Sequence, residues 1–67
     1  MIEREKLTDS TLVEHLRKGD QYTVIALGKM EECPGYWIPS ITFRKNQTGE
    51  VFTRALERFV SKFKIVT

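Results

Sequence analysis

Hydrophobic and polar residues alternate along much of this chain, and a period of two is typical of short strands. From Gln21 to Leu27 the side chains fall on two faces and β-branched residues are frequent, which predicts a strand that ends at Gly28. The stretch from Tyr36 to Arg44 predicts a second strand. Because Pro39 has no backbone N–H, we expect that position to lie at an edge, a bulge or a bend.

Turn-forming residues separate these strands from the elements around them. The paired acids and the Pro-Gly dipeptide within residues 29–35 predict a loop. Residues 45–49 have the length and composition of a hairpin connection, with Asn46 and Gly49 available for positive φ, and residues 50–54 are expected to pair back.

In the C-terminal segment the spacing of apolar residues changes from that of a helix to that of a strand. Its apolar residues first recur at helical spacing and then alternate as in a strand. We therefore expect one helical turn after residue 55, followed by a closing strand.

The N-terminal segment carries the signals of a short helix from Leu7 to Gly19. Thr8 can accept hydrogen bonds from the first free N–H groups, and Asp9 is favourable in the first turn. Gly19 supplies the residue with positive φ that commonly ends a helix. The apolar stripe is narrow, so this helix would cover one edge of a core that other elements form.

Together these elements predict an α+β fold. We expect a small curved antiparallel sheet or an SH3-like barrel, with an N-terminal helix and a helical turn before the last strand. We expect residues 1–67 to form a single domain, with a helical segment over residues 1–19 and the small barrel over residues 20–67. Chains of this size rarely have an unfolding free energy above roughly 3–5 kcal/mol unless a disulfide or a metal stabilises them. A homo-oligomer or a permanent partner therefore stays open.

Two motifs carry a resemblance to a known family. They are Gly-Asp-Gln-Tyr-Thr-Val-Ile-Ala-Leu-Gly at residues 19–28 and Arg-Ala-Leu-Glu-Arg-Phe at residues 54–59. The chain resembles, over roughly residues 18–66, a family of short bacterial and phage proteins of unknown function. That family has a Gly-x-x-Tyr-x-Val strand and an Arg-Pro-Leu-Glu-x-Phe closing motif, and Ala55 stands here where proline is usual. The resemblance implies an SH3-like barrel and a phage or bacterial origin, and it implies no catalytic residues.

The composition is that of a folded protein in a reducing compartment. The chain is 40% hydrophobic and 30% charged, which argues against intrinsic disorder. Cys33 is the only cysteine, so no intramolecular disulfide can form, and we expect the cytoplasm of a bacterium or of a phage-infected host cell. No apolar run approaches the roughly 20 residues that span a bilayer, so no membrane partner is expected.

Charge is distributed unevenly between the two halves. Residues 1–33 carry five Lys or Arg and seven Asp or Glu, whereas residues 34–67 carry six and two. A basic half can mark a surface for nucleic acid or for an acidic protein, although charges of this size are common on inert surfaces as well.

The residues offer little for catalysis. His15 has no evident acid or base partner, and the sequence neighbours of Cys33 are Glu31 and Glu32, which favour the neutral thiol. The spacings that hold a metal and the glycine-rich loops that hold a nucleotide are both missing from the sequence. We therefore expect no enzyme activity, no metal and no cofactor. An enzyme that used His15 and Cys33 would need both in one cleft.

Aromatic and basic residues interleave in the second half of the chain, a mixture that can stack bases and neutralise phosphates. The four phenylalanines are expected in the core. Tyr36 and Trp37 are adjacent on a strand, so at most one of them can join a one-sided core and the other should be exposed. The candidate partner-binding residues are Tyr36, Trp37, Arg44, Lys45, Arg54 and Arg58.

The sequence leaves two functions open. The first is a non-enzymatic interaction module that binds a partner protein through these residues, and the alternative is a nucleic-acid-binding module that uses the same basic and aromatic face. The position of the cations discriminates between them, because clustering on one face favours nucleic acid and dispersal favours protein. The cations concerned are Arg44, Lys45, Arg54, Arg58, Lys62 and Lys64.

Overall fold

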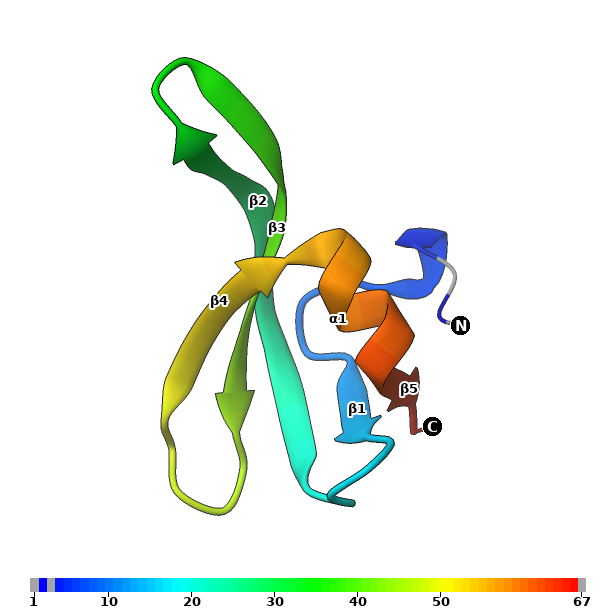
Figure 1. Ribbon diagram of the computed structural model, residues 1–67. Helices are drawn as coiled ribbons and strands as arrows, with labels where there is room; N and C mark the ends of the chain where they lie inside the picture. Colours follow the sequence, from blue (N-terminus) through cyan, green and yellow to red (C-terminus); the bar gives the residue numbers. More distant parts are fainter. Residues whose placement is uncertain (1, 3, 67) are drawn as a thin grey trace.

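The protein is a five-stranded antiparallel sheet with one short α-helix packed against it (Figure 1). The computed structural model describes residue 2 and residues 4–66. In chain order the elements are η1 (Arg4–Lys6), β1 (Leu12–His15), β2 (Gln21–Cys33), β3 (Tyr36–Lys45), β4 (Val51–Ala55), α1 (Leu56–Lys62) and β5 (Phe63–Ile65). The α+β prediction and the expected helix before the last strand are confirmed.

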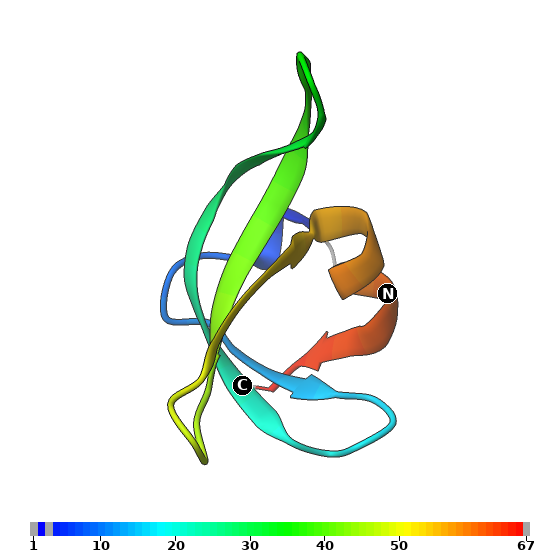
Figure 2. The same cartoon turned by 60° about the vertical axis from the view of Figure 1, so that its left-hand side comes forward.

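The strand order is β4-β3-β2-β1-β5. Strands β1 to β4 therefore follow one another as neighbours, whereas β5 returns to pair with β1. The register of β2 shifts between Val24 and Ala26 and again between Glu31 and Cys33. Such bulges bend a strand and increase its twist, and Figure 2 shows the sheet curving toward α1 and β5.

The sheet is curved but not closed. Strands β4 and β5 are its two edges, and no pairing joins them within residues 2 and 4–66. The expected small curved antiparallel sheet is confirmed, and the expected closed barrel over residues 20–67 is not formed. The physical reason is α1, which connects the two edge strands in the chain and packs against both of them.

The core lies between the concave side of the sheet and α1. Leu56, Phe59 and Val60 are the buried residues of α1. Phe43 and Phe63 are buried with them and Phe52 packs at the margin, which confirms the phenylalanine core. Among the described residues, the buried hydrophobic side chains are Ile2, Leu7, Val13, Tyr22, Val24, Ile41, Phe43, Leu56, Phe59, Val60 and Phe63.

The helix expected from Leu7 to Gly19 is wrong. Leu12–His15 forms β1, which pairs with β2 on one side and with β5 on the other. The signals for a helix serve turns instead: the Thr8 backbone N–H donates to Oγ1 of Thr11 at 3.0 Å, and Gly19, with φ of 76°, closes the turn between β1 and β2. Of the segment 1–19, residues 1 and 3 lie outside the described part of the chain.

The predictions that the strand ends at Gly28 and that residues 29–35 form a loop are also wrong. Strand β2 continues through Gly28 to Cys33 and pairs with β3 along its length, and only Pro34 and Gly35 form the turn. This outer half of the hairpin projects beyond the core (Figure 1), so its two glutamates stay exposed and carry no burial cost.

The prediction for Pro39 is confirmed. Strand β4 reaches only Ala55, which pairs with Ser40 of β3. Pro39 therefore lies one residue beyond the last pair with β4, where a missing N–H costs no ladder hydrogen bond. In the hairpin between β3 and β4, Gly49 adopts positive φ, at 81°, as predicted. Asn46 does not adopt positive φ.

Candidate functional site

The candidate residues divide between two pockets and the open surface. Arg54 and Arg58 line both pockets, Lys45 lines the first and Tyr36 lines the second. Trp37 and Arg44 are exposed and line neither.

The first pocket, which we call the basic pocket, has a volume of about 400 Å³ and opens between β4 and α1. It exists because the sheet does not close there. Its rim carries five cations and its base carries five aromatic rings, and no Asp or Glu is among its described lining residues. The lining residues are His15, Lys18, Tyr22, Phe43, Lys45, Phe52, Arg54, Arg58, Phe59, Lys62 and Phe63.

The aromatic rings form one connected cluster. Phe59 stacks on Phe63 with centroids 4.3 Å apart and an interplanar angle of 12°, and Phe43 lies 5.1 Å from Phe59. Tyr22 meets Phe63 edge to face at 5.3 Å. Because Phe52 alone of the five is only half-buried, the cluster is a rigid base for the pocket and presents little ring area to a ligand.

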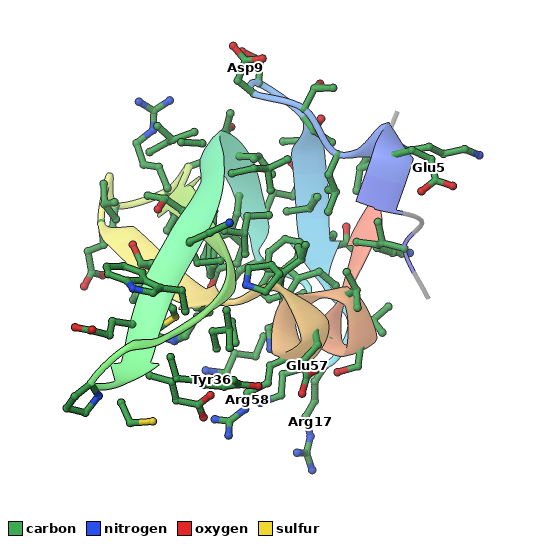
Figure 3. All side chains as sticks on the ribbon, turned by 90° about the horizontal axis from the view of Figure 1, so that it is seen from above. Glu5, Asp9, Arg17, Tyr36, Glu57 and Arg58 are labelled. Carbon is green, nitrogen blue, oxygen red and sulfur yellow. The ribbon has the colours of Figure 1, made fainter. Side chains whose placement is uncertain are left out.

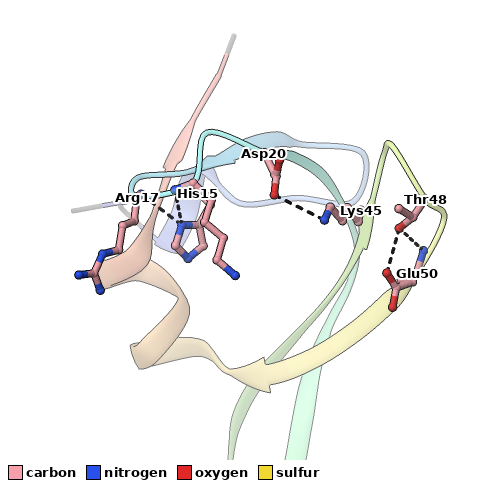
Figure 4. Close-up of polar contacts among 7 residues, drawn as sticks. His15, Arg17, Asp20, Lys45, Thr48 and Glu50 are labelled. Carbon is pink, nitrogen blue, oxygen red and sulfur yellow. Dashed lines mark hydrogen bonds and ion pairs between the residues drawn. The ribbon is translucent and has the colours of Figure 1, made fainter.

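Two of the cations are held in place by neighbours. The Arg54 guanidinium lies 5.5 Å from the centroid of the Phe52 ring, and its Nη1 donates to the Thr53 carbonyl at 2.8 Å. The Lys45 ammonium lies 3.5 Å from a carboxylate oxygen of Asp20 (Figure 4). Asp20 therefore neutralises part of the charge at that end of the pocket.

His15 stands at the edge of the basic pocket. The backbone N–H groups of Arg17 and Lys18 both donate to its Nδ1 at 3.2 Å, as Figure 4 shows. Loss of hydration in this position lowers the pKa of His15 below 6.5, and the positive charges of Lys18 and Lys62 lower it further, while Asp20 acts in the opposite sense. A neutral ring with its proton on Nε2 fits both hydrogen bonds.

The second pocket, which we call the hairpin pocket, has a volume of about 630 Å³. It lies where β4 ends at Ala55 and the chain turns into α1, so that the outer half of the β2–β3 hairpin has no strand beside it. Its lining residues are Met30, Glu31, Glu32, Tyr36, Ile38, Pro39, Thr53, Arg54, Ala55, Glu57 and Arg58.

Acids, an aromatic ring and apolar side chains share this pocket. In Figure 3 the side chain of Tyr36, on the hairpin, lies near that of Arg58 on α1, and Glu57 projects from the same helix. All three line the hairpin pocket. Glu31 accepts a hydrogen bond from the Gly35 N–H at 2.9 Å, which fixes that carboxylate at the turn. Within the described part of the chain, the side chains of Glu32 and Glu57 have no hydrogen bond or ion pair.

Tyr36 and Trp37 are both exposed, at 58% and 57% of their surface. We expected at least one of the pair to be exposed, and the structure shows that neither joins the core. Their position on the projecting hairpin is the reason, because the core ends before this part of the sheet.

Four of the six cations that discriminate between the two functions lie together: Lys45, Arg54, Arg58 and Lys62 line the basic pocket. Arg44 is exposed outside it, and Lys64 lies on β5, 3.6 Å from Glu14. Lys18 and His15 also belong to this group, although the sequence pattern did not point to either of them. Correct placement of residues 12–15 as a strand would have brought both to the same end of the sheet.

The two residues considered for catalysis lie at different ends of the molecule. His15 lines the basic pocket, and Cys33 ends β2 at the tip of the projecting hairpin (Figure 1). No cluster of three or more His, Cys, Asp or Glu side chains that could hold a metal occurs among residues 2 and 4–66. Within the same residues, no helix is both long and apolar enough to span a bilayer.

No protein-family model matches the chain. Neither a curated protein nor a solved structure is significantly similar to it. The resemblance to short bacterial and phage proteins therefore stays a prediction.

Proposed function

We propose that this protein is a non-enzymatic module that binds nucleic acid through the basic pocket. The observation that carries the proposal is the grouping of Lys18, Lys45, Arg54, Arg58 and Lys62 around one opening with no acid among the described lining residues. Grouped cations attract the phosphate backbone, which supplies most of the affinity in nucleic-acid binding.

Loss of hydration is the largest cause of the lowered pKa of His15, and the positive charges of Lys18 and Lys62 lower it further. The part that comes from the two lysines reflects a local positive field, which favours an anion. The open side of the sheet also gives an extended ligand access to the pocket. The strand order, with a helix before the last strand, supports an open variant of the SH3-like arrangement as the scaffold.

The salt dependence of binding tests the proposal. Five Lys and Arg side chains line the pocket, and Lys45 is partly neutralised, so about four phosphate contacts predict a slope of log K against log salt of about −2.8. Anisotropy of a fluorescein-labelled 12-nucleotide DNA strand, titrated between about 50 and 300 mM NaCl, gives this slope. Each of Lys18→Ala and Lys62→Ala should reduce its magnitude by about 0.7.

Two cations outside the pocket supply matched controls. Lys64→Ala and Arg44→Ala remove the same formal charge, and they should leave the slope within its error. If all four variants reduce the slope equally, the surface binds through net charge alone and the pocket is not the site. Absence of binding to DNA and to RNA at low salt refutes the proposal.

A partner protein is the second candidate, and the exposed pair Tyr36 and Trp37 favours it. Tyr and Trp are enriched among the residues that dominate protein interfaces. Affinity capture with the wild type and with the Tyr36→Ala/Trp37→Ala variant tests this function. A partner retained by the wild type and lost by the variant, in high salt, supports it.

A further inference from the structure

The two pockets meet at Arg54 and Arg58, which line both of them. The two pockets are therefore adjacent, and their lining residues extend from the β1–β2 turn to the β2–β3 hairpin. The pockets differ in charge: the basic pocket has no acid among its described lining residues, and the hairpin pocket has three glutamates.

This division suits a nucleotide, whose phosphate is anionic and whose base is neutral. The three glutamates disfavour a phosphate in the hairpin pocket, but a carboxylate accepts hydrogen bonds from the exocyclic amine of a base. Glu32 and Glu57 have no partner within the described part of the chain, so their oxygens are available as acceptors. Tyr36 adds an exposed aromatic ring to the same pocket.

We propose that the hairpin pocket is a base-binding site for single-stranded nucleic acid, with a base stacked on Tyr36 and its exocyclic amine bound by Glu32 or Glu57. This inference rests on the proposed function, since the basic pocket is needed to hold the backbone. Arg54 and Arg58 lie between the two pockets, where they can contact the phosphate that joins the bound base to its neighbour.

The arrangement predicts both a strand preference and a base preference. A base paired in a duplex cannot enter the hairpin pocket, so a single strand should bind more tightly than a duplex of the same length. Cytosine and adenine carry an exocyclic amine and thymine does not, so oligo(dC) and oligo(dA) should bind about threefold to tenfold more tightly than oligo(dT).

Anisotropy titrations with labelled (dC)12, (dA)12, (dT)12 and a mixed 12-base-pair duplex at one salt concentration measure these preferences. Tyr36→Ala should weaken the binding of the single strands by about tenfold and leave the duplex unchanged, whereas Tyr36→Phe should retain the wild-type affinity. Tyr36 is exposed, so these variants should keep the wild-type thermal transition, which far-UV circular dichroism checks.

The glutamates give a test with two opposite readouts. Glu32→Gln/Glu57→Gln removes two negative charges, so the variant should bind (dT)12 more tightly than the wild type does. The same variant should lose most of the preference for (dC)12 over (dT)12, because a neutral amide is a weaker acceptor than a carboxylate. If the two glutamates act only by electrostatic repulsion, the variant should bind every oligonucleotide more tightly by the same factor.

Three results overturn the inference while leaving the proposed function intact. They are equal affinity for single strand and duplex, equal affinity for (dC)12 and (dT)12, and unchanged single-strand binding by Tyr36→Ala. Failure of every oligonucleotide to bind, in contrast, refutes the proposed function itself.

Discussion

Replacement of Phe59 tests the view that the aromatic cluster under the basic pocket holds the fold together. Only 1% of the Phe59 surface is exposed, and its ring contacts Phe63 and Phe43. Truncation of a buried Phe to Ala costs about 3–5 kcal/mol of unfolding free energy. The unfolding free energy of a domain this small rarely exceeds roughly 3–5 kcal/mol. The Phe59→Ala variant should therefore be largely unfolded at 25 °C.

Phe59→Leu separates the aromatic contacts from simple burial. Leucine keeps most of the apolar area but loses both ring contacts, each worth about 0.5–1.5 kcal/mol beyond area. The expected cost is therefore about 1–3 kcal/mol, which corresponds to a fall in melting temperature of about 4–24 °C for a domain of this size. Tyr36→Leu is the matched control, because Tyr36 is exposed and its loss should cost less than about 0.5 kcal/mol.

Urea denaturation followed by far-UV circular dichroism is the suitable assay. Trp37 fluorescence is a poor probe of this transition because Trp37 is exposed on the projecting hairpin, away from the core. If Phe59→Leu costs no more than Tyr36→Leu, the reasoning that links the ring cluster to stability is wrong.

Three further predictions concern local features. The pKa of His15, measured by NMR titration, should lie below 6.5 and should rise in Lys18→Ala and Lys62→Ala. Because the folded state disfavours the proton on His15, the contribution of this residue to the unfolding free energy is present above pH 6.5 and is lost as the pH falls below it. Gly49→Ala should lower the unfolding free energy by about 1 kcal/mol in urea, since φ of 81° is unfavourable for alanine, and an unchanged midpoint would contradict this. Lys64→Met, which breaks the exposed pair with Glu14, should change stability by less than about 1 kcal/mol in the same assay.

The errors of the sequence analysis arise where local signals have two meanings. Thr8, Asp9 and Gly19 suit the ends of a helix, but threonine, aspartate and glycine also form turns, and here they flank a strand. Only the partners of β1 decide between the two, and one of them, β5, lies about fifty residues away in the sequence. A single sequence holds no signal for that pairing.

The extension of β2 through Gly28 has a similar cause. Glycine and paired glutamates are unfavourable in a buried strand, but the outer hairpin is exposed and tolerates both. The elements that were predicted correctly depend on short-range chemistry: the Pro34-Gly35 turn, the edge position of Pro39 and the change from helical to strand spacing near residue 63. The basic pocket could not be predicted, because it combines side chains from all five strands and α1.

The strand order also bears on how the chain folds. Strands β2, β3 and β4 form a meander of consecutive hairpins, whose contacts are local and close quickly, whereas the β1–β5 pair must close a loop of most of the chain. The meander supplies Lys45 and Arg54, but Arg58 and Lys62 reach the pocket only when the C-terminal segment docks. During synthesis, therefore, the basic pocket should be complete only after residues 58–65 have left the ribosome.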